Sequence, residues 1–290
     1  MNPLLLHINY FEQGQSLEDA CRIATQLGAD GIEFRKHPNP KLFQGNEEQY
    51  LDALSRALDA FPLNSVSFGT PGVNLMLTDK KARTTELEKA KHFYRIASKR
   101  FPVHSVNLQT GVLMNPSAAV PGAAYALHGS ASAWDKLWDQ AAEGLRELGA
   151  FGEEIGIQFA LETHPCYLHD TLESCQRLME MVKHPAIGIL WDHTNLLLFP
   201  NPPTVAESFE AIRNRLASVH LKNFVLHPKD GSFVVGALSD GIVNVREQMR
   251  LLAKHSYTGP ICLESPRSGD REWFAAGDLE YLRHLQTSCF

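Results

Sequence analysis

The stretch "GILWDHTN" at residues 188–195 begins as an apolar run and ends abruptly in four polar residues. A strand that is buried on both faces has no use for a carboxylate and an imidazole, because burying unpaired charge is costly. The stretch is therefore either an ordinary strand end with a polar cap or the rim of a functional site. The remaining sequence has to decide between these two interpretations.

Similar apolar runs recur along the chain, and amphipathic stretches of helical period separate them. The predicted strands cover residues 4–10, 31–35, 64–69, 104–111, 157–165, 187–193, 217–224 and 260–266. This alternation requires parallel strands with right-handed crossovers. Eight such units in 290 residues predict an α/β protein with a (β/α)8 TIM barrel as a single domain over residues 1–290. A doubly wound sheet is the main alternative, but no glycine-rich phosphate turn follows the first predicted strand.

Each predicted strand begins apolar and finishes polar. In a parallel barrel these ends meet at one rim, where barrel enzymes have their active sites. The polar residues at the ends include His7, Glu33, Gln109, Glu162, His164, Asp192, His193, His220, Lys222 and Glu264. The stretch at 188–195 is thus one of eight similar strand ends, which favours a functional site over a simple cap.

Four of these residues predict a metal centre. Glu162, Asp192, His220 and Glu264 end the fifth to the eighth predicted strands. Three carboxylates cannot converge in a dry pocket without a cation, because like charges at short range force protonation. We therefore expect one divalent metal ion, with Mn²⁺, Mg²⁺ or Co²⁺ favoured and Zn²⁺ as an alternative. Each residue alone is more often a solvated rim residue or an ion-pair partner. The joint placement on four consecutive strands favours the metal.

Several blocks resemble the signature of the xylose-isomerase-like superfamily of sugar isomerases and epimerases. They are "ALETHP" (160–165), "LWDHTN" (190–195), "SVHLKN" (218–223), "LSDGIVN" (238–244) and "GPICLES" (259–265). The superfamily includes ketose 3-epimerases, inosose isomerases and dehydratases, and hydroxypyruvate isomerase. The resemblance implies a TIM barrel, the same four metal ligands and a homo-oligomer (dimer or tetramer). Three positions depart from the ketose epimerases, with Asn195 in place of His, Asn223 in place of Asp and Leu226 in place of Arg.

The predicted site suits proton transfer next to a carbonyl. A metal that binds a carbonyl oxygen and the adjacent hydroxyl acidifies the C–H between them by stabilising an enediolate. Glu162 and Glu264, which flank that plane, can then remove and return a proton. Isomerisation or epimerisation of a sugar or keto-sugar follows, whereas loss of a β-hydroxyl would make the protein a keto-polyol dehydratase.

The predicted substrate contacts come from the same rim. They are His193, Asn195, Lys222, His164, Gln109 and Glu33. Most of these residues have a structural alternative. Lys222 can pair with Glu264, and Glu33 can join a hydrogen-bond network with Arg35. His193 can orient a metal ligand from behind. His169 is expected at the cap of the following helix.

Composition limits the other classes of function. A net charge of −6 and a pI near 6.1 disfavour nucleic-acid partners, including the substrate of a trinuclear-zinc DNA phosphodiesterase related to apurinic endonucleases. A catalytically silent barrel is disfavoured by the intact ligand set. No signal peptide or apolar run of membrane-spanning length is evident, and five scattered cysteines fit a reduced, cytoplasmic setting. The loops at about 111–133 and 224–241 are predicted to act as a lid or a subunit contact, the second with a hairpin.

Overall fold

The computed structural model describes the whole chain except residues 1, 41, 70–71 and 119–124. The chain divides into two compact units, Met1–Ser67 with Val219–Phe290, and Phe68–Ser218. Each unit is an α/β structure and is described by itself. Strands β3 (Ser65–Gly69) and β7 (Leu216–Leu221) run across the two boundaries.

The larger sheet contributes four adjacent parallel strands to the first unit, in the order β2 (Gly31–Arg35), β1 (Leu4–His7), β10 (Ile261–Leu263) and β7. The register pairs His7 with Glu33 and Cys262 with His220. Side chains two residues apart on a strand face the same way, and so do paired residues on neighbouring strands. His7, Glu33, Cys262 and His220 therefore share one face of the sheet, and Glu264, directly after β10, continues that face.

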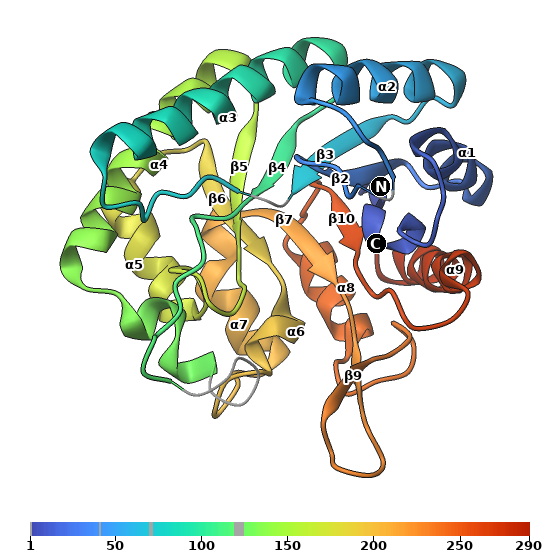
Figure 1. Cartoon of the computed structure of the whole chain (residues 1–290). Coiled ribbons are helices and arrows are strands. Elements are labelled where there is room, and N and C mark those ends of the chain that lie inside the picture. Colours follow the sequence, from blue (N-terminus) through green and yellow to red (C-terminus); the bar gives the residue numbers. More distant parts are fainter. Residues whose placement is uncertain (1, 41, 70–71, 119–124) are drawn as a thin grey trace. The chain divides into compact units, whose positions relative to one another are not determined.

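Helices α1 (Leu17–Leu27), α2 (Glu47–Ala60), α8 (Val245–Lys254) and α9 (Arg271–Cys289) belong to the same unit. Local sequence explains their ends: Ser16 and Asp19 form a capping box at the start of α1, and Gly28 ends it at φ 70°. Helix α1 packs against α2 and α9, as Figure 1 shows, and α9 also contacts β10. These helices bury the apolar face of the sheet and leave its polar face for the site.

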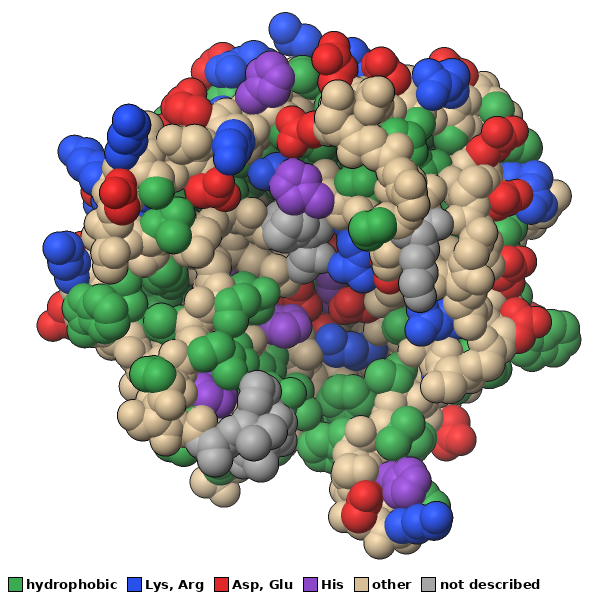
Figure 2. Space-filling view, in the orientation of Figure 1, with side chains coloured by type: hydrophobic (Ala, Val, Ile, Leu, Met, Phe, Trp, Pro, Cys, Tyr) green, Lys and Arg blue, Asp and Glu red, His purple; other side chains and the backbone are tan. Residues whose placement is uncertain are grey.

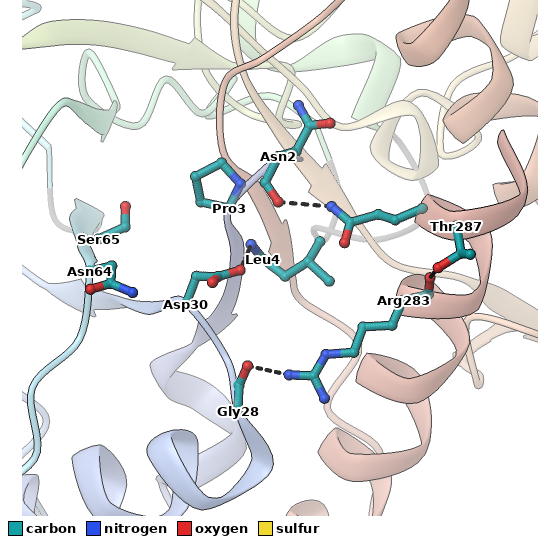
Figure 3. A pocket seen from close by; sticks show the side chains of 10 residues that line it. Asn2, Pro3, Leu4, Gly28, Asp30, Asn64, Ser65, Arg283 and Thr287 are labelled. Atoms are coloured by element: carbon teal, nitrogen blue, oxygen red, sulfur yellow. Dashed lines mark hydrogen bonds between the residues drawn. The ribbon is translucent and has the colours of Figure 1, made fainter. Parts of the chain in front are cut away.

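A polar cavity of about 380 Å³ lies at the amino ends of β1 and β2, beside α9 (Figure 3). The Gln286 amide donates to the Asn2 carbonyl, and the Arg283 guanidinium donates to the Gly28 carbonyl. These bonds fasten α9 to the chain just before β1 and to the end of α1. The amino ends of barrel strands contribute to stability rather than to catalysis, and this cavity has that structural role.

In the second unit, β4 (Ser105–Leu108), β5 (Gln158–Glu162) and β6 (Ile187–Trp191) are adjacent and parallel. The register pairs Asn107 with Ala160 and Glu162 with Leu190. These four side chains consequently share one face. Residues of the other parity, such as Phe159 and Trp191, are fully buried on the opposite face.

That opposite face is covered by helices. Tyr94 of α3 packs on Phe159, and Phe209 of α7 packs on Trp191, each with ring centroids 5.3 Å apart. The helices of this unit are α3 (Lys80–Arg100), α4 (Asp135–Ile155), α5 (Leu172–Val182), α6 (His193–Leu196) and α7 (Val205–Ile212). The packing of α3 and α7 fixes which side chains at the ends of β5 and β6 remain for the site.

All eight predicted strands are present, but most end earlier than predicted. Residues Ile8–Phe11 form a 3-10 helix where the prediction continued the first strand, and β4 ends at Leu108 rather than at residue 111. Polar side chains at the rim bond to the backbone and turn the chain out of the sheet. The His7 ring, for example, accepts the Asn9 N–H at 3.2 Å.

The predicted hairpin is formed by antiparallel strands β8 (Phe224–Leu226) and β9 (Phe233–Val235). Its strands carry exposed apolar side chains, including Leu226 and Val234, and charged side chains gather at its tip (Figure 2). In the other long loop, residues 119–124 lie outside the described residues, and Tyr125–Leu127 and Gly129–Ser132 form short 3-10 helices. A lid or subunit role for these loops stays a prediction. In the described part of the chain, no helix combines the length and apolarity needed to cross a membrane.

Candidate active site

In the unit Phe68–Ser218, Glu162 ends β5 as a buried carboxylate held by two amides. Asn107 Nδ2 donates to its Oε2 at 2.7 Å, and Asn195 Nδ2 donates to its Oε1 at 3.2 Å. Asn195 Nδ2 also donates to the Thr163 carbonyl at 2.9 Å. Hydrogen bonds to an ionised carboxylate favour the charged form, so these amides both orient Glu162 and support its charge.

Asp192 follows β6 and lies next to this group. Its Oδ1 accepts the Asn195 N–H at 3.1 Å and caps the short helix α6. The Thr163 hydroxyl joins the two strand ends, because it accepts the Asp192 N–H at 3.0 Å and donates to the Asp192 carbonyl at 2.9 Å. Asn195 therefore contacts both carboxylates, which brings the predicted ligands Glu162 and Asp192 together.

His193 lies on the opposite side of the strand end. Its Nδ1 is 2.9 Å from the Ser208 hydroxyl of α7, and its ring packs edge-on against Trp191. Burial lowers the pKa of His193 to about 4, so the ring is neutral near pH 7. The structure does not bring His193 to Glu162 and Asp192, because neighbouring residues at a strand end face opposite ways.

Tyr167 connects the remaining predicted contacts of this unit. Its hydroxyl donates to Gln109 Oε1 at 3.0 Å, and its ring lies 5.2 Å from that of His164. His169, expected at a helix cap, instead stacks on Tyr167 and bonds through Nδ1 to the Glu162 carbonyl. Thr171 is the cap of α5. Burial lowers the pKa of His169 to about 4, so its neutral ring supports the backbone of Glu162.

In the other unit, His220 lies between two carboxylates. Its Nδ1 is 3.1 Å from Glu264 Oε2, and its Nε2 is 3.1 Å from Glu33 Oε2. The Ser67 hydroxyl donates to Glu33 at 3.3 Å. The side chains of His220 and Glu33 are 0% and 1% exposed, and that of Glu264 is 20% exposed. Only Glu264 of these three side chains is therefore open to a ligand arriving from solvent.

Glu264 is surrounded by groups that carry hydrogen. Lys222 Nζ lies 3.5 Å from its Oε2, and His7 Nε2 lies 3.8 Å from its Oε1. Burial alone would raise the pKa of Glu264, but Lys222, His7 and His220 together lower it well below its usual range. The predicted pairing of Lys222 with Glu264 is present. Arg35 forms its ion pair with Glu12 at 2.5 Å, while Glu33 lies against His220.

Asn223 is a buried clamp after β7. Its Nδ2 donates to the carbonyls of Leu238 and Val243 at 3.2 and 3.0 Å, and its Oδ1 accepts the N–H groups of Phe224 and Val243. A carboxylate would face two carbonyl oxygens without a hydrogen to share. The amide is therefore required by the loop that it holds.

Sequence reasoning did not give several supporting residues a role in the site. Asn107, Ser67 and Tyr167 each bond to a predicted site residue. Asn107 and Ser67 are recognisable from the sequence as polar residues at the ends of predicted strands, but the sequence does not show which neighbour each one contacts. Tyr167 had no comparable signal, because its contact depends on the path of a loop.

Curated relatives of this chain include two inosose dehydratases. The Clostridium tetani enzyme is 27% identical over 160 residues, 51% of this chain and 52% of the relative. The Clostridium beijerinckii enzyme is 23% identical over 233 residues, 74% of this chain and 73% of the relative. The chain spans about half the length of most of the curated relatives it matches.

Solved structures share the fold. A xylose isomerase-like TIM barrel protein from Mycobacterium smegmatis in complex with magnesium has a TM-score of 0.72 at 23% identity, covering 94% of this chain and 88% of that one. The probable 3-DHS dehydratase of petrobactin synthesis from Bacillus anthracis has a TM-score of 0.73 at 20% identity, covering 98% and 99%. A D-allulose 3-epimerase from Methylomonas sp. has a TM-score of 0.72 at 16% identity, covering 98% of both chains.

These likenesses confirm the predicted fold class, a (β/α)8 barrel of eight parallel strands with interspersed helices. The family described as xylose isomerase-like TIM barrel matches residues 21–285, nearly the whole sequence. The chain belongs to the xylose isomerase-like TIM barrel family.

Proposed function

We propose that the protein is a divalent-metal-dependent isomerase or epimerase of a sugar or keto-sugar. The observation that carries the proposal is the pair Glu162 and Glu264, each at a strand end and each held by donors that favour the carboxylate form, amides for Glu162 and the Lys222 ammonium for Glu264. A carboxylate that removes a proton from carbon must be ionised beforehand and positioned within hydrogen-bond reach of that proton. Both glutamates meet the first requirement.

The donor set fits a hard divalent cation. Glu162 and Asp192 offer carboxylate oxygens in one unit, and Glu264 offers a carboxylate beside the imidazole of His220 in the other. We assign these four residues as the ligands of one ion, with Mn²⁺, Mg²⁺ or Co²⁺ favoured. When bound, such an ion supplies Lewis-acid stabilisation of the negative charge that develops on substrate oxygens.

The protein's own residues divide the remaining work. Glu162, oriented by Asn107 and Asn195, removes or returns the proton on one side of the substrate, and Glu264 does so on the other. Returning the proton to the opposite face of the same carbon gives epimerisation, and returning it to the neighbouring carbon gives isomerisation. Lys222, beside Glu264, can hold a hydrogen toward a substrate oxygen.

The six predicted substrate contacts divide by their surroundings. We assign direct contact with substrate to Gln109, His164 and Lys222. Gln109 and His164 lie beside Tyr167, and Lys222 lies beside Glu264. Asn195 orients Glu162, and His193 braces β6 against α7. Glu33 contacts His220 and acts through it.

Dehydration of a keto-polyol is the second candidate. The curated relatives in two Clostridium species are inosose dehydratases, and one structural neighbour is a probable 3-DHS dehydratase. Both reactions begin with proton removal next to a carbonyl. They diverge afterwards, because a dehydratase lets a β-hydroxyl leave where an isomerase returns the proton. Glu264, surrounded by His7, Lys222 and His220, can serve either as the returning acid or as the acid that assists the leaving hydroxyl.

The proposal is tested by incubating the protein, reconstituted with Mn²⁺, Mg²⁺ or Co²⁺, with ketoses and keto-inositols in D₂O. Nuclear magnetic resonance should show deuterium in a rearranged sugar for an isomerase, or an unsaturated product for a dehydratase. The Glu264→Gln variant should lose at least about a hundredfold of turnover, whereas Glu154→Gln, on an exposed face of α4, should not. Metal-loaded protein that exchanges no proton with any of these substrates would overturn both candidates.

The number of metal ions bound per chain is a second test of the proposed function. Elemental analysis should find one divalent ion per chain in the wild type and none in His220→Ala. Two or three zinc ions per chain would instead revive the phosphodiesterase alternative, whose chemistry needs a multinuclear cluster.

A further inference from the structure

The carboxylate of Glu33 is buried among proton-bearing side chains. It is 1% exposed, and it lies 3.1 Å from His220 Nε2 and 3.8 Å from His7 Nε2, with a hydrogen bond from the Ser67 hydroxyl. A buried carboxylate is tolerated only where hydrogens meet its oxygens. The favourable arrangement is therefore one in which the imidazole of His220 donates a hydrogen to Glu33.

The tautomer of His7 follows from its backbone contact. The Asn9 N–H donates to His7 Nδ1 at 3.2 Å, so that nitrogen carries the lone pair and the ring hydrogen is on Nε2. Nε2 lies 3.8 Å from Glu33 Oε1 and from Glu264 Oε1. His7 thus turns an N–H toward Glu33. Which nitrogen of His220 carries the hydrogen therefore depends on the two carboxylates that contact His220, Glu33 and Glu264.

His220 has one nitrogen on each carboxylate. A neutral imidazole carries a single N–H, and a metal needs the lone pair of the other nitrogen. A hydrogen on Nδ1 would leave the Nε2 lone pair against the fully enclosed Glu33, which is repulsive. A hydrogen on Nε2 satisfies Glu33 and points the Nδ1 lone pair toward Glu264, the more accessible carboxylate.

We propose that Glu33 is a positioning residue that holds the hydrogen of His220 on Nε2 and so makes Nδ1 the metal-binding atom. The inference rests on the proposed function, from which it takes the metal. Carboxylate partners of this kind fix ring orientation and raise the basicity of the ligating nitrogen, and their loss costs about 10- to 100-fold in metal affinity.

The structure also contains the opposite arrangement. Glu33, His220 and Cys262 offer ligand atoms that all lie within 4.8 Å of one another, and all three residues are buried. A metal there would take Nε2 and a thiolate. Both arrangements use His220, but they differ in the nitrogen that binds the ion. An ion at Nδ1 can therefore be distinguished from an ion at Nε2.

The first test is spectroscopic and needs no substrate. In protein labelled with ¹⁵N-histidine and loaded with Zn²⁺, long-range ¹H–¹⁵N correlations should show the His220 hydrogen on Nε2 and the metal on Nδ1. Co²⁺-loaded protein should show no thiolate charge-transfer band. Coordination through Nε2, or a thiolate band that disappears in Cys262→Ala, would overturn the inference.

The second test measures Mn²⁺ affinity by competition with a chelating dye. Glu33→Gln should bind about 10- to 100-fold more weakly than the wild type. Glu12→Gln, which changes a carboxylate of the same unit whose partner is Arg35, should bind normally. Equal affinity for wild type and Glu33→Gln would overturn this inference alone. A wild type that binds no divalent ion would overturn the metal assignment of the proposed function as well.

Discussion

The two units hold their carboxylates by different means. In Phe68–Ser218, Glu162 and Asp192 accept hydrogen bonds from the uncharged amides of Asn107 and Asn195 and from a backbone N–H. In the other unit, the ammonium group of Lys222 and the imidazoles of His7 and His220 lie around Glu264. The first set orients charge without cancelling it, whereas the second set includes the ammonium of Lys222, which offsets the charge of Glu264.

This difference suggests how the proposed reaction divides its labour. Amides keep the negative charge of Glu162 and Asp192 available for a cation, because a neutral donor does not compensate a full charge. Groups that gain or lose protons surround Glu264, which suits a residue that must both take up and release one. We therefore expect metal affinity to depend most on the amide-held carboxylates, and proton return to depend most on Glu264.

The largest effect is expected for Asn223, whose hydrogen bonds hold the loop after β7 in the unit that contains Glu264. Asn223→Asp would place a carboxylate against the carbonyls of Leu238 and Val243, which now accept its amide hydrogens. Burying that unpaired charge should lower the free energy of unfolding by about 2 to 4 kcal/mol. Urea denaturation measures the loss. The control is Asn46→Asp at the exposed cap of α2, where Asp caps as well as Asn. An Asn223→Asp protein as stable as this control would contradict the clamp.

Sequence reasoning is most informative where one residue carries the signal. Glu162, Asp192, His220 and Glu264 were predicted as site residues because each interrupts or ends an apolar run, a pattern that burial energetics makes conspicuous. The order of strands and helices was equally visible, because the periods of 2 and 3.6 residues differ clearly. The structure confirms both units as α/β and places the four residues at strand ends.

Sequence reasoning reaches less far where the partner of a residue decides its role. His193 was predicted to contact substrate or to orient a metal ligand from behind, and in the structure it packs on Ser208 of α7. His169 was assigned to a helix cap, but it bonds to the Glu162 carbonyl seven residues earlier. Such contacts depend on the path of a loop, which local propensity does not encode.

The free energy of unfolding should depend on pH through two buried histidines of the amide-held unit, His193 and His169. His193 in the amide-held unit has a pKa of about 4 because of burial, whereas in the unfolded chain it titrates near its ordinary value of 6.5. Between these values the unfolded state binds more protons, so stability should fall as pH decreases from about 6.5 to 4. The full shift corresponds to about 3 kcal/mol. His169, with the same lowered pKa, should contribute a similar slope.

The measurement is denaturant unfolding at pH 7 and pH 5 for wild type and His193→Gln. The variant should lose about one of the two protons taken up on unfolding. His92→Gln, an exposed position on α3, should retain the wild-type slope. An unchanged slope in His193→Gln would mean that His193 is not held neutral by burial.

The smallest effect tests the comparison most directly. Removing the 2.7 Å bond from Asn107 to Glu162 by Asn107→Ala should raise the pKa of Glu162, because a hydrogen bond to a charged group is worth about 1.5 to 3 kcal/mol. Lys222→Met should likewise raise the pKa of Glu264, whose charge Lys222 supports from 3.5 Å.

Carbon-13 resonances of labelled glutamate in the metal-free protein report both pKa values, and Asn64→Ala, an exposed amide change, serves as the control. If the halves work as proposed, Asn107→Ala shifts Glu162 alone and Lys222→Met shifts Glu264 alone. A shift of both carboxylates by either variant would show that charge is shared between them, and the distinction between amide-held and cation-held carboxylates would then have to be abandoned. Separate shifts would instead assign orientation to Asn107 and charge compensation to Lys222, because only the second substitution removes a positive charge.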